Sequence, residues 1–296
     1  MGITTKADAS VRTTSGLVLV DKPAGITSHD VVSIVRRATG ERRVGHTGTL
    51  DPFATGLLVV LVGRGTRLIP YVDGEPKVYE ATIALGTETD TDDTTGRVVR
   101  ESLPPSDDAI AGAIASLTGV IDQMPPAYSA KQVEGRRAYA AARQGKPLDL
   151  KPATVTVSDW TILERNPRDL RVRITCGSGT YIRALARDLG RLTGSAAHLG
   201  ALRRLRSGPF DVTNAVTADA LDAGAFELAP LRDAIPSIDV RRLDDAELVR
   251  VAHGNAIDAL PADSSRVALL DHAGELVAVA EREDGQLRPR LVLRDG

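Results

Sequence analysis

The longest uninterrupted aliphatic run in this 296-residue chain covers residues 57–62, and it limits what the chain can fold into. So short a run is far from the length that spans a bilayer, but it suits a strand buried in a sheet. Aromatic residues make up only 3% of the chain, so the core must be mostly aliphatic. The N-terminal 16 residues are polar and lack the apolar stretch of a signal peptide, which predicts a cytoplasmic protein with no membrane segment.

Strand and helix patterns alternate along the first two thirds of the chain. A helical pattern follows Ser28, the predicted N-cap, and closes at Gly40. Two further helices are predicted at residues 106–117 and 180–192, and strands at residues 16–20, 57–62, 77–85, 154–163 and 170–176. The pattern predicts a mixed α/β core.

Two regions depart from that core. Residues 124–151 are polar, basic and bounded by proline, which indicates an insertion over the core with a short helical piece at 137–144. After Pro236 the chain changes to short strand-like runs at residues 267–270, 276–280 and 291–293. These runs predict a small β-rich C-terminal module.

The sequence offers no pattern typical of a metal site. Cys176 is the lone cysteine, and the five histidines lack metal-ligand spacing. The acidic loop that starts at Asp90 superficially resembles a calcium loop, and Glu101 stands at its twelfth position. Its sixth position is Thr95, where an EF-hand needs glycine, and a strand pattern rather than a helix precedes it. We therefore expect neither calcium nor any other metal.

Charge is segregated, although the net charge is only −2. Residues 165–206 contain ten Arg and two Asp, whereas residues 80–122 contain nine acidic and two basic residues. One interpretation is a basic face that follows the phosphates of a nucleic acid. The other is that arginines simply replace lysines on solvated helix faces, since the whole chain has only six lysines.

One carboxylate lies in a loop of small residues. Asp51 sits within residues 45–56, a stretch rich in glycine and threonine that leads directly into the aliphatic run. Small residues allow a ligand or another backbone to approach closely, and Pro52 stiffens the turn. Local chemistry alone favours an aspartate that caps its own turn over a catalytic one.

Residues 45–58, GHTGTLDPFATGLL, resemble the catalytic motif of the TruB family of tRNA pseudouridine synthases. Further stretches resemble family motifs in the same order: GLVLVDKPAGI at 16–26, K-x-Y at 77–79, the acidic loop at 86–96, the insertion at 125–139 and GTYIRALARDLG at 179–190. The resemblance implies a largely antiparallel sheet of the pseudouridine synthase type and a PUA-like C-terminal domain. The implied division is a flexible tail at 1–15, a catalytic domain at 16–236 with the insertion at 124–151, and the small domain at 237–296.

The implied activity is isomerisation of uridine 55 in the T-loop of tRNA, by a monomer that needs no cofactor and no guide RNA. Asp51 would be the catalytic carboxylate, and Arg183 would pair with it and lower its pKa. Tyr79 would stack on the target base and help to remove the proton at C5. Whether Asp51 attacks C1′, adds to C6 or deprotonates C2′ stays open.

The resemblance also implies RNA contacts, because a base held in a folded loop must be flipped out to react. His46 would fill the space that the uridine leaves. The other implied contacts are Lys22, Lys77, Tyr181, Arg136, Arg137 and Arg204, with Arg143, Lys146 and Arg203 as further phosphate contacts. Two features depart from the family pattern: Lys131-Gln132 in the insertion, and an excess of acidic over basic residues in 241–296.

Three other functions compete with a stand-alone synthase. The first is a tRNA-binding folding factor without essential chemistry, and the second is a guide-RNA-dependent relative of the dyskerin type. The third is a hydrolase that uses Asp51, which is disfavoured because the motif has no second carboxylate of the kind that glycosidases need.

Overall fold

A long mixed sheet forms the body of the molecule in the computed structural model, which describes residues 14–128, 132–133, 136–137, 148 and 150–293. Within that part of the chain the sheet has ten strands in the order β14-β1-β3-β12-β4-β11-β10-β7, with β2 on β3 and β13 on β12. The strands are β1 (Gly16–Lys22), β2 (Val44–His46), β3 (Thr55–Val62), β4 (Lys77–Leu85), β7 (Gly119–Gln123), β10 (Ala153–Arg165), β11 (Asp169–Cys176), β12 (Ala197–Ser207), β13 (Phe210–Asp211) and β14 (Val216–Thr217).

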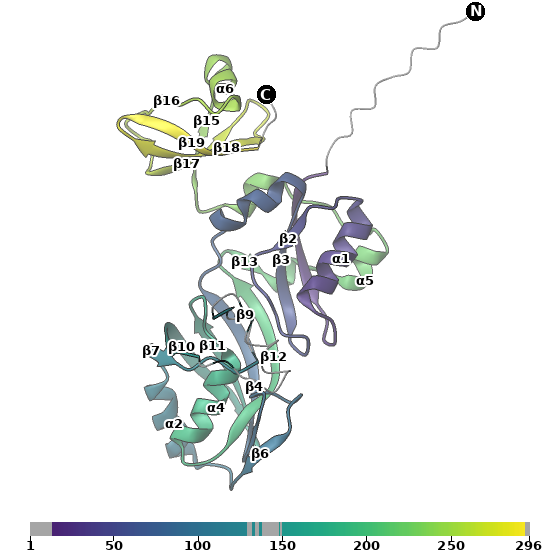
Figure 1. Ribbon diagram of the computed structural model, residues 1–296, viewed down its shortest axis with the longest axis vertical. Coiled ribbons are helices and arrows are strands. Elements are labelled where there is room, and N and C mark those ends of the chain that lie inside the picture. The colour runs from purple at the N-terminus through teal and green to yellow at the C-terminus, as the bar shows by residue number, and fades with distance from the viewer. Residues whose placement is uncertain (1–13, 129–131, 134–135, 138–147, 149, 294–296) are drawn as a thin grey trace, which may run out of the picture.

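Most neighbouring strands in this sheet are antiparallel. The parallel pairs are β1 with β14 and β3 with β12. The pairing of β3 with β12 joins the two halves of the sheet, so the halves lie end to end along the long axis (Figure 1). The expected mixed fold with a largely antiparallel sheet is confirmed.

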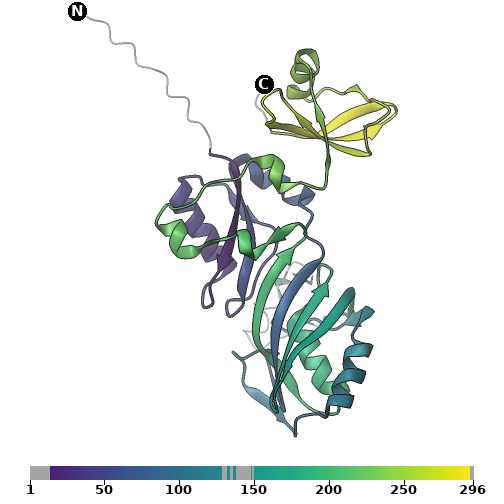
Figure 2. The ribbon, with the colours of Figure 1, turned by 180° about the vertical axis from the view of Figure 1, so that it is seen from behind.

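Helices cover the two halves differently. Helices α2 (Asp107–Ser116) and α4 (Ile182–Leu192) lie on the same face of the half of the sheet that contains β4, β11, β10 and β7, the lower half in Figures 1 and 2. They bury Ile110, Leu185 and Leu189 against β4, β10 and β11. Helices α1 (Ser28–Thr39) and α5 (Ala218–Asp222) pack beside β1 and β3, and the 3₁₀ segments are η1 (Gly63–Tyr71), η2 (Val212–Asn214) and η3 (Leu231–Ala234).

The strands and helices predicted outside residues 124–151 are present, whereas the cap of α1 and the strand β12 differ from the prediction. Thr27, not Ser28, caps α1, because its hydroxyl accepts the Asp30 N–H, while the side chain of Ser28 is buried. Strand β12 was missing from the prediction because its arginines hide its apolar alternation. The predicted helical piece at 137–144 lies outside the described residues, except for Arg137 in the short β9 (Arg136–Arg137), which pairs with β8 (Gln132–Val133).

A second sheet forms at the C-terminus. It has the order β15-β17-β18-β19-β16, and its elements are β15 (Asp239–Arg242), α6 (Asp245–Ala252), β16 (Ile257–Asp258), β17 (Arg266–Leu270), β18 (Leu276–Glu283) and β19 (Gln286–Val292). Leu61 of β3 and Leu68 of η1 share one apolar cluster with Leu270 and Val279 of this module. The two parts therefore share a core.

Polar contacts reinforce this junction. The Arg64 guanidinium donates to the Leu293 carbonyl at 2.8 Å and Arg67 donates to that of Val292 at 2.6 Å. Arg266 lies 5.5 Å above the centre of the Tyr71 ring, within cation–π range. No helix in the described part of the chain is long and apolar enough to cross a membrane.

Candidate active site

Asp51 lies in the loop that joins β2 to β3, where the two halves of the long sheet meet. The residue before it is fixed from α1: the Ser28 hydroxyl donates to the Leu50 carbonyl at 3.2 Å and accepts the Leu50 N–H at 2.9 Å. The Ala54 N–H donates to the Asp51 carbonyl at 3.1 Å and closes the turn. The backbone of Asp51 makes this turn, which leaves its carboxylate available for another partner.

That partner is Arg183, on the first turn of α4. The Arg183 Nε lies 2.9 Å from Asp51 Oδ2, and Nη2 donates to Oδ1 at 3.2 Å. The Arg183 side chain is 5% exposed, whereas that of Asp51 is 35% exposed. A bidentate ion pair of this kind fixes the orientation of the carboxylate as well as neutralising its charge. The structure thus brings together the two residues that the motifs assigned to one site.

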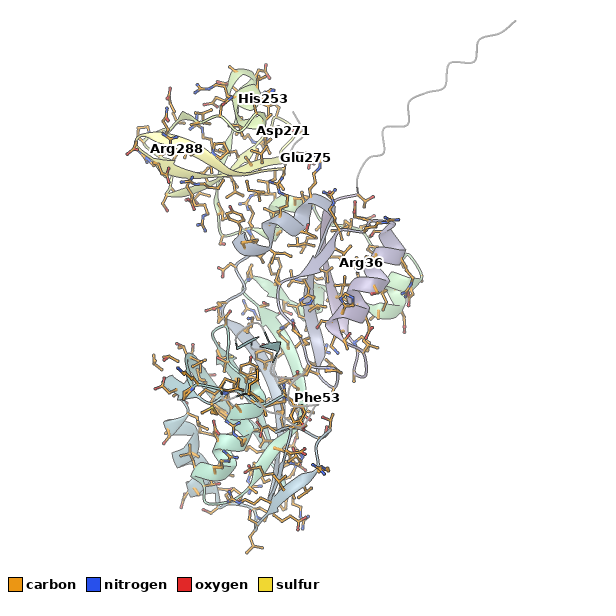
Figure 3. All side chains as sticks on the ribbon, viewed as in Figure 1. Arg36, Phe53, His253, Asp271, Glu275 and Arg288 are labelled. Atoms are coloured by element: carbon orange, nitrogen blue, oxygen red, sulfur yellow. The ribbon has the colours of Figure 1, made fainter. Side chains whose placement is uncertain are left out.

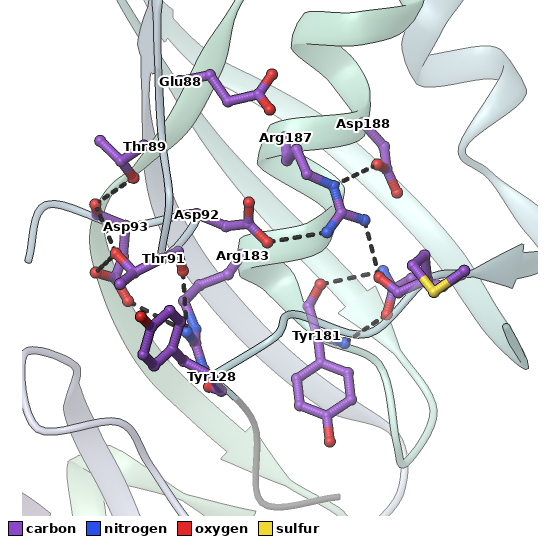
Figure 4. Close-up of polar contacts among 12 residues, drawn as sticks. Glu88, Thr89, Thr91, Asp92, Asp93, Tyr128, Tyr181, Arg183, Arg187 and Asp188 are labelled. Atoms are coloured by element: carbon purple, nitrogen blue, oxygen red, sulfur yellow. Dashed lines mark hydrogen bonds and ion pairs between the residues drawn. The ribbon is translucent and has the colours of Figure 1, made fainter. Parts of the chain in front are cut away.

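Arg183 is also held on its other side (Figure 4). It pairs with Asp93 at 3.3 Å and donates to the carbonyls of Thr91 at 3.1 Å and Tyr128 at 2.8 Å. Its orientation is therefore set by three segments distant in sequence: the Asp51 loop, the acidic loop and the start of the insertion.

Arg183 acts on the pKa of Asp51 in the expected, downward direction, but burial of the carboxyl has a larger and opposite effect. Burial raises the pKa of this carboxyl above its ordinary value; Arg183 and Lys22 oppose that rise, and Asp93 adds to it. The net direction is upward because removing the carboxylate from water outweighs the cations beside it. Asp51 therefore accepts a proton more readily than an exposed aspartate does.

The acidic loop serves as a set of partners for arginines. It forms a hairpin of β5 (Thr87–Thr89) and β6 (Val98–Glu101). Arg183, Arg187 and Arg191 are spaced by four residues on one side of α4, and they pair with Asp93, Asp92 and Glu88 at 3.3, 2.9 and 2.6 Å, respectively. Burial raises the pKa of Asp92 to about 6. Among the described residues, no group of three or more His, Cys, Asp or Glu is arranged to hold a metal ion.

The segregated charges have a structural explanation that differs from the basic face proposed for them. Six of the ten arginines in residues 165–206 pair with acidic residues of 80–122: Arg165, Arg171, Arg173, Arg183, Arg187 and Arg191. The two segments are neighbours in the fold and neutralise each other. Most of this positive charge is thus not free to contact phosphates.

Two pockets have both Asp51 and Arg183 in their linings. The smaller, of 130 Å³, has mainly apolar and aromatic walls: Thr49, Leu50, Asp51, Tyr79, Thr180, Tyr181, Ile182, Arg183 and Leu202. The larger, of 480 Å³, is lined by Asp51, Pro52, Phe53, Asp90, Thr91, Asp93, Thr95, Gly96, Arg97, Tyr128 and Arg183. Phe53 lies where the Asp51 loop meets the lower half of the sheet (Figure 3).

Tyr79 forms a wall of this smaller pocket from strand β4. Its side chain is buried, and burial raises the pKa of its phenol, which the nearby Arg204 only partly offsets. A phenol that holds its proton so firmly suits stacking better than proton removal. Tyr181, expected as an RNA contact, lines the same pocket from the N-cap position of α4.

Lys22 and Arg204 were predicted to contact RNA, but both are buried and use their donors inside the protein. The Lys22 ammonium, 0% exposed, donates to the carbonyls of Pro23, Ile26 and Pro52 at 2.9, 2.8 and 3.2 Å. Arg204 donates to the carbonyls of Leu57 at 2.7 Å and Gly48 at 3.0 Å. The two cations hold the backbone of the Asp51 loop through the carbonyls of Pro52 and Gly48. This internal role replaces the predicted contact with RNA.

The buried ammonium makes the stability of the protein depend on pH. Burial lowers the pKa of Lys22 from 10.5 to about 8. Between these values the unfolded chain binds more protons than the folded one, so folding stability rises with pH in this window. Relative to Lys22→Met, we expect the wild type to gain about 1–3 kcal/mol between pH 7 and pH 10, measured by urea unfolding. Lys151→Met, at an exposed lysine, is the control; parallel curves for wild type and Lys22→Met would contradict the expectation.

The other residues that were predicted to contact RNA fall into two groups: some have a described environment, and some lie in the insertion. His46 is half-buried on β2, and burial lowers the pKa of its ring, which favours the neutral form. Its Nδ1 has no hydrogen-bond partner among the described residues. Lys77 donates to the Ser178 hydroxyl at 3.1 Å, and Arg203 pairs with Asp21 at 2.8 Å. The side chains of Arg136, Arg137, Arg143, Lys146 and the Lys131-Gln132 pair lie outside the described residues.

Sequence reasoning missed several residues that shape the site. Asp93 was noted only as part of the acidic loop, although the spacing of the three arginines on α4 could have predicted an acidic partner segment. Ser28 was assigned to the helix cap instead of the Asp51 loop. Phe53 and Gln123 gave no local signal.

Comparisons with known proteins match most of the chain to one family. Residues 36–182 match the model of the TruB family pseudouridylate synthase N-terminal domain, and residues 183–240 match that of the tRNA pseudouridylate synthase B C-terminal domain. The tRNA pseudouridine synthase B of Thermobifida fusca is 48% identical over 94% of this chain and 98% of its own length. That of Leifsonia xyli subsp. xyli is 45% identical over 90% of this chain and 92% of its own. Among solved structures, a chain of a Cbf5–Nop10–Gar1 complex superposes with a TM-score of 0.70 at 25% identity, covering 95% of this chain and 85% of that one.

Proposed function

The chain belongs to the TruB family of pseudouridylate synthases, and we propose that it isomerises uridine 55 in the T-loop of tRNA with Asp51 as its catalytic carboxylate. The observation that carries the proposal is the Asp51–Arg183 pair at the mouth of a small pocket with apolar and aromatic walls. The reaction breaks the N1–C1′ bond, turns the base and joins C5 to C1′. It involves no net redox change, so it requires no cofactor.

The geometry suits each demand of this reaction. The pocket excludes water around the base while it turns, and Tyr79 and Leu202 offer flat or apolar walls. Asp51 faces the pocket with one third of its side chain exposed, so it can reach the sugar or the base. Arg183 holds the carboxylate in place and favours its ionised form. The target uridine must be flipped out of the T-loop to enter.

Buried ion pairs also argue for chemistry over mere tRNA binding. Removing charges from water is costly, and the pairing of Arg183 with Asp51 and Asp93 offsets that cost only with good geometry. A folding factor that only grips the outside of tRNA gains nothing from this arrangement. An enzyme needs a carboxylate in a dry site.

We propose that the enzyme acts alone, as a monomer. The proteins named tRNA pseudouridine synthase B of Thermobifida fusca and Corynebacterium efficiens share 48% and 42% identity over 94% and 95% of this chain, whereas the chain of the Cbf5–Nop10–Gar1 complex shares 25%. We also propose the division into a tail at 1–15, a catalytic domain at 16–236 and a small C-terminal domain at 237–296.

The test is tritium release by the purified protein alone from an unmodified tRNA transcript labelled at C5 of its uridines. We expect one tritium released per tRNA, since a single uridine is converted. A transcript with cytidine at position 55 is the matched control and should release none. Release that requires an added guide RNA would overturn the stand-alone proposal, and release from the control transcript would overturn the assignment of position 55.

A further inference from the structure

Gln123 makes a pair of hydrogen bonds that no motif predicts. It is the last residue of β7, an edge strand, and its side chain is 1% exposed. Its Nε2 donates to the Tyr181 carbonyl at 3.1 Å, and its Oε1 accepts the Tyr181 N–H at 2.8 Å. A carboxamide supplies a neutral donor and acceptor side by side, so this side chain pairs with both backbone polar groups of a single residue.

The residue that Gln123 grips is the N-cap of α4. Tyr181 has no side-chain hydrogen bond of its own to cap this helix. The first N–H groups of a helix need partners from elsewhere, and a helix without a capping side chain begins less firmly. A distant strand therefore fixes the start of α4, two residues before Arg183.

The residues after Gln123 also contact α4, and Figure 4 shows Tyr128 beside Arg183. The Met124 carbonyl accepts from Arg187 at 2.8 Å, and the Tyr128 carbonyl accepts from Arg183 at 2.8 Å. Between them stand two buried prolines, whose rings fix the backbone. Residues 123–128 thus form a stiff segment, here called the bracket, which contacts the start of α4 at Tyr181, Arg183 and Arg187.

We propose that Gln123 is a positioning residue that fixes the start of α4 and thereby aligns Arg183 with the carboxylate of Asp51. The proposal rests on the function proposed above. Its physical basis is that both ends of the alignment are separately anchored: Ser28 and Lys22 hold the Asp51 loop, and the bracket holds α4. Loosening the bracket changes the position of Arg183 relative to a loop that stays fixed.

The first experiment measures single-turnover tritium release with three variants. Gln123→Met keeps the length of the side chain and loses both hydrogen bonds; Gln123→Glu keeps only the acceptor. We expect the rate to fall about 10- to 100-fold in both variants, because misplacement by about 1 Å has effects of this size and the Glu carboxylate places an acceptor against the Tyr181 carbonyl. The Kd for tRNA should stay within about threefold, since Gln123 is buried. Asp122→Asn, next along β7 but exposed, is the matched control and should behave as wild type.

The second readout separates positioning from general damage. The charged groups around Asp51 are Arg183 on α4, Asp93 on the acidic loop and Lys22 on β1. If Arg183 moves away, the carboxylate loses its closest cation and takes up a proton at higher pH. The acid limb of the rate–pH profile should therefore shift upward by about half a unit or more in Gln123→Met. Simple destabilisation lowers the rate without moving this limb.

The outcomes distinguish this inference from the proposed function. A wild type that releases no tritium overturns the function itself. An active wild type with a Gln123→Met variant within threefold of its rate, or with an unmoved acid limb, overturns the positioning role alone. If Gln123→Met does not fold, Gln123→Glu decides by the same two readouts.

Discussion

Asp51→Asn is expected to abolish pseudouridine formation, with a loss of at least about 10⁴-fold in the single-turnover rate. The amide has the shape of the carboxylate but cannot ionise, so it can neither attack the sugar or the base nor remove a proton. Arg183 keeps Asp93 and the carbonyls of Thr91 and Tyr128, so the site should stay assembled. Binding of tRNA should change only a few-fold.

Tritium release and a filter-binding Kd measure the two effects separately. Asp90→Asn is the matched control, because Asp90 is another carboxylate at the larger pocket, where it pairs with the exposed Arg97. We expect it to retain its rate within about threefold, since this exposed pair contributes little. An Asp51→Asn variant with 1% or more of the wild-type rate would contradict a catalytic role, and loss of tRNA binding would point to a structural one.

Gly56→Ala is expected to destabilise the fold by about 3 kcal/mol or more. Gly56 has a φ of +100°, and a Cβ there would lie 2.2 Å from the Arg204 carbonyl oxygen and 2.7 Å from its nitrogen. This is where β3 meets β12 directly behind the Asp51 loop. The backbone of Arg204 cannot easily retreat, because its side chain is bound to the carbonyls of Leu57 and Gly48.

Gly119→Ala isolates the contribution of the close approach. Gly119 has the same φ of +100°, but no atom lies within 4 Å of a Cβ built on it. This variant should lose only about 1–2 kcal/mol, the cost of the backbone conformation. Denaturant unfolding of both variants gives the comparison. Equal losses would show that the backbone of β12 yields, contrary to the expected clash.

The sequence predicted the elements with strong periodicity and the residues that lie in motifs. Asp51 and Arg183 come together as the resemblance implies, and alternation located the half-buried β4. Strand β12 was missed because Arg203, Arg204 and Arg206 interrupt its apolar residues. Residue type alone does not reveal burial, so Lys22 and Arg204 resembled surface cations.

Contacts over long distances in sequence are a second limit. Gln123 and Tyr181 are separated by 58 residues, and nothing in either local pattern links them. The acidic loop and α4 are similarly distant, so their charges looked like two independent patches. Only the fold shows that each segment neutralises the other.

The apolar cluster shared by η1 and the C-terminal sheet has a consequence for how the chain can evolve. Leu61 and Leu68 on one side and Leu270 and Val279 on the other are constrained by each other, so they must change together or not at all. The outer surface of the module is under no such restraint. Losing the module would expose the buried leucines to water, where they promote aggregation. The module therefore contributes to the stability of the catalytic half through this shared cluster, whether or not its outer surface contacts RNA.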